Sequence, residues 1–261
     1  MSVVHETVPK TRFSIQSSPV TGCEEANPVL SIDHLNFSYP DGHVALRGIN
    51  LTLCQGEKAA LVGANGAGKS TLMLHLNGIL VGEGDVQVSG LPVIKTNLGT
   101  IRAKIGLVFQ NPDDQLFSPT VFEDVAFGPL HMGLPENEVR ERVRHALEMV
   151  KMSQYAGRLS HHLSMGEKKR IAIATVLSMD PEILVLDEPS AGLDPRARRG
   201  LINLLSELPQ TMLVSTHDML MVRDLFPRMI IMDEGTIVAD GPTHELMEDS
   251  ALLEAHGLER P

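Results

Sequence analysis

Several classes of protein are excluded by what the chain has little of. Its 261 residues include two cysteines, Cys23 and Cys54, which support neither a disulfide framework nor the spacing of a zinc site, so we expect a reducing cytosol. No apolar run approaches the roughly 18 to 20 residues that span a bilayer, and the first residues lack the apolar stretch of a signal peptide. Lys and Arg (22) are outnumbered by Asp and Glu (33). The net charge of −11 argues against a general nucleic-acid binder, which needs a positive surface to displace counterions from phosphates.

The 43% of hydrophobic residues can form one sizeable core or two small ones. Residues 1–28 show weak periodicity and form an N-terminal extension, whereas strand-like alternation begins at residue 29. Helical patterns then separate short strand-like runs, which predicts an α/β domain with a largely parallel sheet over 29–241; these runs are KAALVG, IGLVF, EILVLD, TMLVS and RMIIMD. Residues 112–165 contain no convincing strand but include PENEVRERVRHALEMV, which has helical spacing, so we expect an inserted helical subdomain there. Residues 242–261 are expected to form a C-terminal helical tail.

A glycine-rich loop, LVGANGAGKST, carries the strongest chemical signal. It fits G-x-x-x-x-G-K-[ST] and lies between an apolar strand and a helical run. Glycines let backbone N–H groups curl around phosphate oxygens, and the helix that follows directs its positive end at them. Lys69 can then reach the β- and γ-phosphates, and Ser70 can offer its hydroxyl to Mg²⁺. The nucleotide-binding residues predicted from this loop are Gly63, Asn65, Gly66, Ala67, Gly68, Lys69, Ser70 and Thr71.

Polar residues at three strand ends complete such a pocket. In EILVLDEPS, Asp187 emerges at the carboxyl end of a buried strand and fits a magnesium ligand, while Glu188 fits the base that polarises water. Gln110 follows IGLVF, where its amide could touch both metal and water, and His217 follows TMLVS, where it could meet the γ-phosphate. Tyr39 has two interpretations, strand packing or an aromatic face for adenine.

The segment LSMGEKKR, residues 163–170, also has two interpretations. Its residues alone favour a capped helix start with a basic first turn. However, a serine hydroxyl, a glycine backbone and a helix N-terminus also suit an anion. The cations Lys168, Lys169 and Arg170 either offset the charge of Glu167 or form an ordinary solvated helix face.

In this order, the motifs resemble the nucleotide-binding subunits of ABC transporters; the motifs are Tyr39, GANGAGKST, VFQNPDDQLF, LSMGEKKR, ILVLDEP, SAGLD and STHD. The resemblance covers residues 29 to about 241. It implies a P-loop NTPase of the ABC-ATPase fold, with a RecA-like core, a small antiparallel β subdomain and an inserted helical subdomain. It also implies ATP and Mg²⁺ as cofactors, with Ser70, Gln110 and Asp187 as metal ligands.

By the same resemblance, Ser164 and Gly166 would cap the γ-phosphate of ATP held by a second subunit, with Glu167 and Asp194 also at the nucleotide. The usual signature is LSGGQ, so Met165 and Glu167 are departures. Met165 should project away from the phosphate. Glu167 can accept a hydrogen bond from a ribose hydroxyl but adds negative charge near the nucleotide.

Two longer stretches, GLVFQNPDDQLFSPTVFEDVAFGP and LSMGEKKRIAIATVLSMDPEILVLDEPSAGLDP, resemble the ATPases of energy-coupling-factor importers of prokaryotes. Among these, the likeness is to the cobalt/nickel ATPases, the CbiO group. This implies a peripheral protein on the cytoplasmic face of the cell membrane, paired with a second ATPase subunit, which we expect to be a second copy of the chain. The segment Asn111 to Phe117 would meet the transmembrane coupling and substrate-binding subunits. Without the resemblance, that segment is an acidic loop before a helix.

Other functions remain open. The solute could be cobalt, nickel or a vitamin, because the solute contacts another polypeptide. ABC ATPases also act on DNA, but this chain lacks their coiled-coil arms and cysteine clusters and is acidic, so we expect no nucleic-acid partner. A non-hydrolysing module is disfavoured because the catalytic set of Lys69, Ser70, Gln110, Asp187, Glu188 and His217 is complete.

Overall fold

The computed structural model describes residues 28–260, and the predicted N-terminal extension falls almost wholly outside them. The strands are β1 (Leu30–Ser38), β2 (Val44–Leu53), β3 (Lys58–Val62), β4 (Glu83–Val88), β5 (Leu91–Pro92), β6 (Ile105–Val108), β7 (Ile183–Asp187), β8 (Thr211–Ser215), β9 (Arg228–Asp233) and β10 (Thr236–Pro242). The helices are α1 (Lys69–Leu76), α2 (Leu98–Lys104), α3 (Val121–His131), α4 (Glu136–Met149), α5 (Met165–Leu177), α6 (Pro195–Glu207), α7 (Met219–Leu225), α8 (Thr243–Glu248) and α9 (Ser250–Ala255). Short 3₁₀ turns cover Pro112–Asp114, Ser153–Tyr155 and Ser160–His162.

Two sheets organise the described chain. A small antiparallel sheet has the order β2-β1-β4-β5, and the larger sheet has the order β10-β9-β3-β8-β7-β6. The five strands from β9 to β6 run parallel, and β10 pairs antiparallel with β9 at one edge. All five strand-like runs of the sequence lie on these parallel strands. The prediction of an α/β fold with a separate antiparallel sheet is therefore confirmed.

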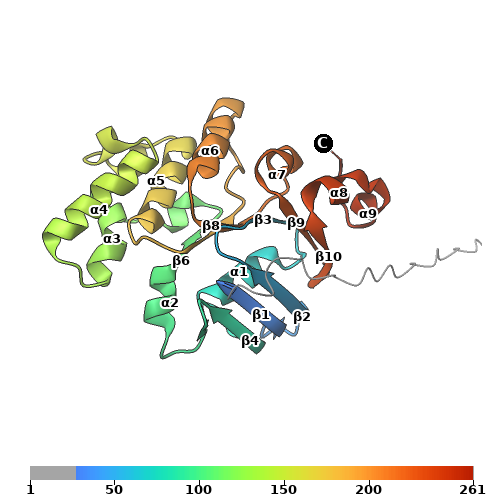
Figure 1. The fold of residues 1–261 in the computed structure, drawn as a ribbon. Helices are drawn as coiled ribbons and strands as arrows, with labels where there is room; N and C mark the ends of the chain where they lie inside the picture. The colour runs from blue at the N-terminus through green and yellow to red at the C-terminus, as the bar shows by residue number, and fades with distance from the viewer. Residues whose placement is uncertain (1–27, 261) are drawn as a thin grey trace, which may run out of the picture.

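The large sheet separates two apolar clusters, because successive side chains of a strand face opposite sides. On β3, Ala60 and Val62 join the cluster that includes side chains of α3 to α7, while Ala59 and Leu61 join the cluster with the small sheet and α1. Figure 1 shows the small sheet below the large one, and α3, α4 and α5 together at one side. Both faces of the parallel strands are thus covered, which explains why their sequences are continuously apolar.

The segment predicted to be helical, residues 112–165, contains α3 and α4. On α4, Val139, Val143, Ala146 and Leu147 are buried at helical spacing, while Arg and Glu side chains pair along the exposed face. Helix α3 begins with a capping box in which Thr120 accepts from the backbone N–H of Glu123, and the carboxylate of Glu123 accepts from Thr120. In the described part of the chain, no helix is both long and apolar enough to cross a bilayer.

Candidate functional site

The phosphate loop connects β3 to α1, so that its backbone lies at the carboxyl end of a central parallel strand. Two of its glycines are required by close packing. A Cβ at Gly63 would lie 2.1 Å from the carbonyl oxygen of Met232, and one at Gly68 would lie 2.7 Å from that of Ala45. Both glycines also have positive φ, 153° at Gly63 and 102° at Gly68, which side chains disfavour. The sequence pattern therefore reflects a backbone path that only glycine allows.

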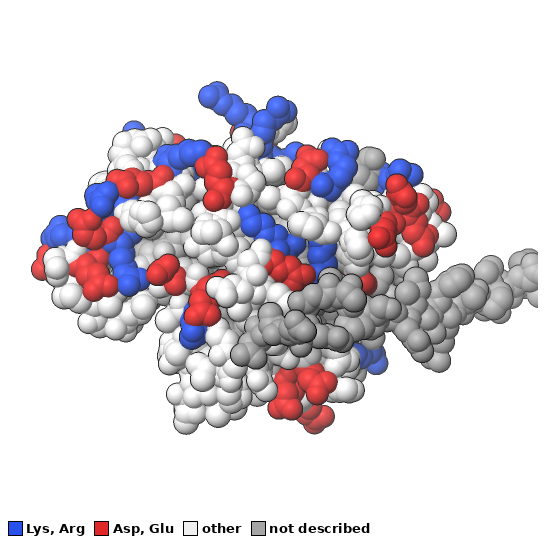
Figure 2. All heavy atoms as spheres, viewed as in Figure 1, with Lys and Arg blue, Asp and Glu red and all other residues white. Residues whose placement is uncertain are grey.

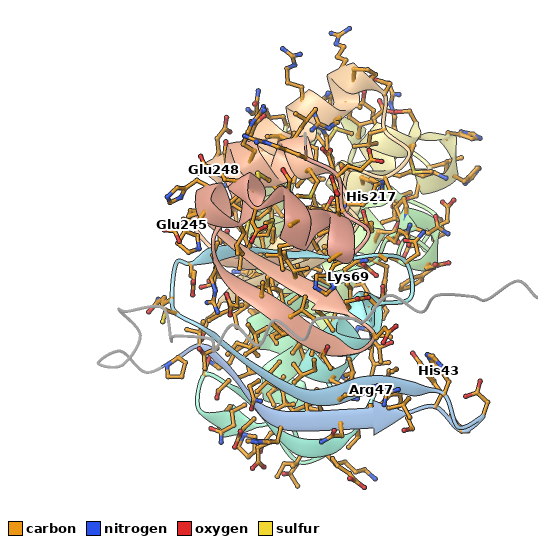
Figure 3. The ribbon with its side chains drawn as sticks, turned by 90° about the vertical axis from the view of Figure 1, so that its right-hand side faces the viewer. His43, Arg47, Lys69, His217, Glu245 and Glu248 are labelled. Atoms are coloured by element: carbon orange, nitrogen blue, oxygen red, sulfur yellow. The ribbon has the colours of Figure 1, made fainter. Side chains whose placement is uncertain are left out.

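Lys69 is the first residue of α1 and its side chain points back across the loop. Its ammonium group donates hydrogen bonds to the carbonyl oxygens of Gly63 (2.7 Å) and Ala64 (3.0 Å). Burial lowers the pKa of Lys69, and the negative charges of Glu188 and Asp187 oppose this shift. In Figure 3, Lys69 lies near the centre of the molecule, above the strands of the small sheet. The loop thus presents a buried cation where phosphate oxygens would bind.

The acidic pair lies at the end of β7, the strand next to β8. Ser215, the last residue of β8, donates its hydroxyl to the carboxylate of Asp187, and both its side chain and its carbonyl accept from the N–H of Glu188. Glu188 itself has φ of 43°, a left-handed conformation that is uncommon for this residue type. Its carboxylate is 10% exposed and lies 2.8 Å from Nδ1 of His217. Neighbouring strand ends therefore fix the direction of both acids.

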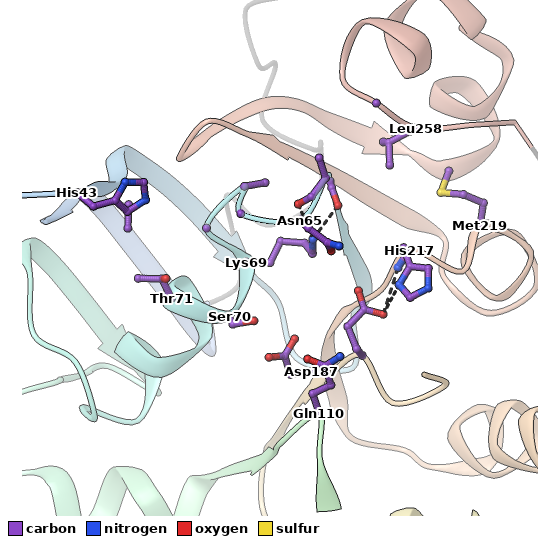
Figure 4. A pocket seen from close by; sticks show the side chains of 18 of the residues that line it. His43, Asn65, Lys69, Ser70, Thr71, Gln110, Asp187, His217, Met219 and Leu258 are labelled. Carbon is purple, nitrogen blue, oxygen red and sulfur yellow. Dashed lines mark hydrogen bonds and ion pairs between the residues drawn. The ribbon is translucent and has the colours of Figure 1, made fainter. Parts of the chain in front are cut away.

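A cleft of about 770 Å³ joins these elements. Its lining includes every predicted residue of the phosphate loop and strand ends: Tyr39, Gly63, Asn65, Gly66, Ala67, Gly68, Lys69, Ser70, Thr71, Gln110, Asp187, Glu188 and His217. Figure 4 shows the side chains of Ser70, Asp187 and Gln110 close together in this cleft. A hydroxyl, a carboxylate and an amide oxygen are hard donors of the kind that magnesium prefers, so the residues fit that ion.

Tyr39 follows the end of β1 at one side of the cleft, where its hydroxyl lies 3.0 Å from Oγ1 of Thr71. Its ring is stacked with that of His43, with centroids 6.4 Å apart. It also meets the ring of Phe37 edge-on at 5.0 Å. The ring of Tyr39 therefore packs at the end of the strand and also lines the cleft, and contact with adenine stays a prediction.

The signature group is not part of this cleft. Ser164, Gly166, Glu167 and Asp194 line a second hollow of about 940 Å³ in the same chain. There, Ser164 and Glu167 form a capping box at the start of α5, with the serine hydroxyl 2.8 Å from the carboxylate. The pKa of Glu167 is lowered because its carboxylate accepts hydrogen bonds from Tyr155 and from Ser164. Asp194 caps α6 by accepting from two backbone N–H groups.

The cations after the signature do not form one solvated face. Lys168 pairs with Asp113 at 2.6 Å, and the guanidinium of Arg170 donates to the carbonyl of Val150 at 3.2 Å. Lys169 is only 4% exposed, so the interpretation of these cations as a solvated face is wrong for this residue. Its ammonium group instead contacts the strand ends of the nucleotide cleft.

The segment Asn111 to Phe117 lies beside Gln110 and is partly fixed by the rest of the chain. The backbone N–H groups of Phe117 and Ser118 donate to Asp124, a buried residue of α3, at 3.0 and 2.8 Å. Gln115 was expected to face a partner, but its amide nitrogen donates to the carbonyl of Ala172 and the hydroxyl of Thr175 within this chain. Phe117, by contrast, is 65% exposed.

Sequence reasoning missed several residues at the cleft. Ser215 contacts both acids, and its position at the end of TMLVS, two residues before His217, was the available signal. His43, Met219 and residues 257–259 also line the cleft, and no motif marks them. They come from the turn before β2, from the start of α7 and from the C-terminal segment, which only the folded chain brings to the phosphate loop.

Comparison with known proteins identifies the family of the chain. Residues 46–191 match the family model described as ABC transporter. A Gloeobacter violaceus protein named as a candidate ABC transporter ATP-binding protein is 57% identical, covering 89% of this chain and 96% of that protein. The energy-coupling factor transporter ATP-binding protein EcfA of Methanothermobacter thermautotrophicus is 51% identical, covering 89% of this chain and 77% of EcfA.

Two solved structures share the fold. The structure of cbiO1 from Clostridium perfringens, part of the ABC transporter complex cbiONQ, is 39% identical with a TM-score of 0.78, covering 88% of this chain and 94% of that one. A dimeric post-hydrolysis structure of the ATP-binding cassette MJ0796, bound to ADP and Pi, is 26% identical with a TM-score of 0.74, covering 82% and 98%. The chain is therefore an ATPase of the ABC transporter family, which uses ATP with Mg²⁺, in the branch that includes the energy-coupling-factor ATP-binding subunits.

Proposed function

We propose that the chain powers a membrane importer of the energy-coupling-factor type and hydrolyses ATP with Glu188 as the base. The roles that we assign rest on one observation: the phosphate loop, Asp187 and Glu188 line the same cleft. Magnesium held by Ser70, Asp187 and Gln110 would neutralise charge on the phosphate oxygens. Lys69 binds the β- and γ-phosphates, and Glu188 takes the proton of the attacking water.

His217 has a place in this mechanism beside Glu188. Its Nδ1 lies 2.8 Å from the carboxylate, so the ring orients the base from one side. The side chain of His217 is 66% exposed, which leaves Nε2 available to meet the γ-phosphate. We therefore assign His217 to both contacts, one from each ring nitrogen, which requires an N–H on each nitrogen because the carboxylate and the phosphate are both acceptors.

The test of the base is Glu188→Gln, which keeps the shape of the side chain but cannot accept a proton. We expect kcat to fall by roughly 10²- to 10⁴-fold, the usual contribution of a general base, with ATP affinity largely kept. Glu182→Gln is the matched control, because Glu182 precedes the amino end of the same strand and pairs with Lys104 away from the cleft. A Glu188→Gln variant that hydrolyses ATP at the wild-type rate would exclude Glu188 as the base.

We also propose that two copies of the chain form two composite ATP sites. The phosphate loop and the signature group line separate hollows of one chain, so one chain cannot bring Ser164 to its own Lys69 in this arrangement. The dimeric state of the related cassette MJ0796 supports such pairing. In sedimentation experiments, ATP and Mg²⁺ should produce a dimer, most clearly for Glu188→Gln. A strict monomer at saturating ATP would argue for pairing with a different ATPase instead.

The surface that we propose for the membrane partner is Asn111 to Phe117. Its exposed aromatic ring, Phe117, lies edge-on against Phe127 of α3 at 4.9 Å. Leu130 and Met132, at the end of the same helix, are also exposed. Because the segment follows Gln110 directly in the chain, a partner bound at Phe117 would be joined to the nucleotide cleft through a few residues. Gln115 is half-buried and its amide nitrogen donates within the chain, so we propose Phe117 rather than Gln115 as the anchor of this contact.

For the solute we propose cobalt or nickel ions, on the likeness of the chain to cbiO1. A vitamin importer is the second candidate, and it predicts uptake of a vitamin with no metal uptake. Assembly of the ATPase with its membrane subunits in vesicles, followed by ATP-dependent uptake of Co²⁺, Ni²⁺ and vitamins in parallel, decides between them. Metal uptake above the level of vesicles with Glu188→Gln supports the first candidate.

A location on the cytoplasmic face of a prokaryotic membrane follows from the importer proposal. The alternative from another class is an ABC ATPase that acts on DNA. Figure 2 shows acidic and basic side chains interspersed on the face in view, rather than a basic stripe, and the net charge is −11. Nucleotide-dependent sedimentation with membranes that carry the partner subunits, but not with duplex DNA, is the expected result. Binding to DNA alone would favour the alternative.

A further inference from the structure

Lys169 is a buried cation in the third position after the signature glycine, and among residues 28–260 no carboxylate forms a hydrogen bond to it. Its ammonium group donates to two backbone carbonyl oxygens, that of Gln110 at 3.1 Å and that of Glu188 at 3.0 Å. The side chain belongs to α5, whereas both acceptors follow strands of the large sheet. One side chain therefore joins the helix to the two strand ends that carry a predicted metal ligand and the predicted base.

These two carbonyls lie just beyond the point where strands β6 and β7 stop pairing. Strands β6 and β7 pair in parallel from Ile105 opposite Ile183 to Val108 opposite Leu186. If that register continued for two residues, Gln110 would stand opposite Glu188, but the ladder has already ended. The hydrogen bonds of Lys169 replace the missing ladder bonds at this point, and so hold the two segments at a fixed separation.

The backbone of Glu188 needs such support. Its φ of 43° is costly for a residue with a long side chain, and strained residues persist only where their surroundings hold them. The N–H of Glu188 is held by Ser215, and its carbonyl accepts from Ala191 (3.1 Å) as well as from Lys169. The direction of the carboxylate depends on this backbone, because the side chain leaves from the same residue.

Burial of a cation is itself unfavourable, and an apolar side chain of similar length would fill the space at lower cost. Burial lowers the pKa of Lys169 to about 8, against the opposing charges of Glu188 and Asp187. Packing alone does not explain a lysine here. We infer that Lys169 is a positioning residue for ATP hydrolysis, which fixes the backbones of Gln110 and Glu188 relative to each other through its two hydrogen bonds.

The test is Lys169→Met, which keeps the length of the side chain and removes the donor. Misplacement of a catalytic group by about 1 Å can reduce a rate by about 100-fold, so we expect kcat of the isolated ATPase to fall by about 10- to 100-fold. ATP binding, measured by displacement of a fluorescent ATP analogue, should stay within about twofold, because the phosphate loop is untouched. The melting temperature should change little, because removal of a buried cation offsets the loss of its two hydrogen bonds.

Two further variants separate positioning from general packing. Lys169→Arg can donate to the same two carbonyls and should recover most of the lost turnover. Lys104→Met is the matched control: Lys104 precedes β6 and pairs with Glu182 before β7, so it joins the same two strands at the opposite end. We expect this control to keep wild-type kcat and ATP affinity.

Three results would overturn the inference. One is a Lys169→Met variant with kcat within about twofold of wild type. Another is a joint loss of turnover, ATP binding and thermal stability, which would show that Lys169 only supports the fold. The third is a folded Lys169→Arg variant that binds ATP but stays as slow as Lys169→Met. If Lys169→Met does not fold, Lys169→Gln, which retains a polar group, is measured in the same assays.

Discussion

Replacement of Phe117 tests the contact with the membrane partner separately from ATP hydrolysis. The ring is 65% exposed and is not part of the nucleotide cleft, while the backbone of the residue is held by Asp124. Phe117→Ala therefore removes the ring without releasing the segment. Within the chain, the loss is the edge-on contact with Phe127, which is worth about 0.5 to 1.5 kcal/mol.

At an interface the same truncation costs more. Loss of an aromatic anchor from a protein interface typically costs about 2 kcal/mol or more, which corresponds to roughly thirtyfold weaker association. Assembly with the membrane subunits and ATP-dependent solute uptake should both fall, together with partner-stimulated hydrolysis. Basal ATPase of the isolated variant should remain close to wild type.

The assays are assembly of the purified subunits, solute uptake in reconstituted vesicles and phosphate release by the ATPase alone. Ile94→Ala is the matched control, because Ile94 is also an exposed apolar residue but lies between β5 and α2. Unchanged assembly and uptake for Phe117→Ala would refute the interface. Loss of basal ATPase would instead show that Phe117 supports the nucleotide site.

Two further predictions concern stability. Arg228 is buried and forms a two-pronged ion pair with Asp240 (2.7 and 2.6 Å), so Arg228→Met should lower the free energy of unfolding by about 3 to 5 kcal/mol in urea titrations. The exposed Arg144→Met should leave the free energy of unfolding nearly unchanged, because solvent screens its ion pairs, and equal losses for the two variants would contradict the role of burial. Burial raises the pKa of Asp218, but hydrogen bonds and charge from Arg198 outweigh it, so the folded-state pKa is lowered. Asp218 therefore contributes stability above its unfolded pKa and loses it as pH falls through the folded pKa. The difference between wild type and Asp218→Asn, measured by urea titration, should shrink on acidification below pH 3.8, and a constant difference would refute it.

Local patterns identified the central strands and the phosphate loop because both depend on neighbouring residues. A buried parallel strand is apolar on both faces, so runs such as ILVL in β7 stand out in any sequence. The glycines of the loop report positive φ and close backbone approach, which are also local. The apolar runs and the glycine pattern together were therefore enough to predict where the cleft lies.

The strand order could not be predicted in the same way. β3 pairs with β8 and β9, so Ala60 lies opposite Val214 and Met229, more than 150 residues along the chain. Such partners are chosen by the packing of whole layers, and no short spacing records them. For the same reason, no sequence signal showed that the amide of Gln115 donates to the carbonyl of Ala172 in α5.

The burial of Lys169 could not be predicted from the sequence for a different reason. Helix periodicity identifies the buried face of a helix only when the opposite face is polar. In α5 the residues after Arg170 are buried on all sides, from Ile171 through Ala174, so no single face stands out. A lysine within a run of three cations then looks solvated, and only the folded chain shows which of the three turns inward.

Asp124 links two parts of the helical layer that the sequence separates by more than 40 residues. Its carboxylate accepts from the backbone of Phe117 and Ser118 and, at 2.5 Å, from the hydroxyl of Ser160, four residues before Ser164. We expect the two segments to open together in hydrogen exchange, since the departure of either from α3 would leave a buried carboxylate short of a donor. Under that expectation, a partner that pulled on the segment before α3 would also loosen the approach to the signature helix.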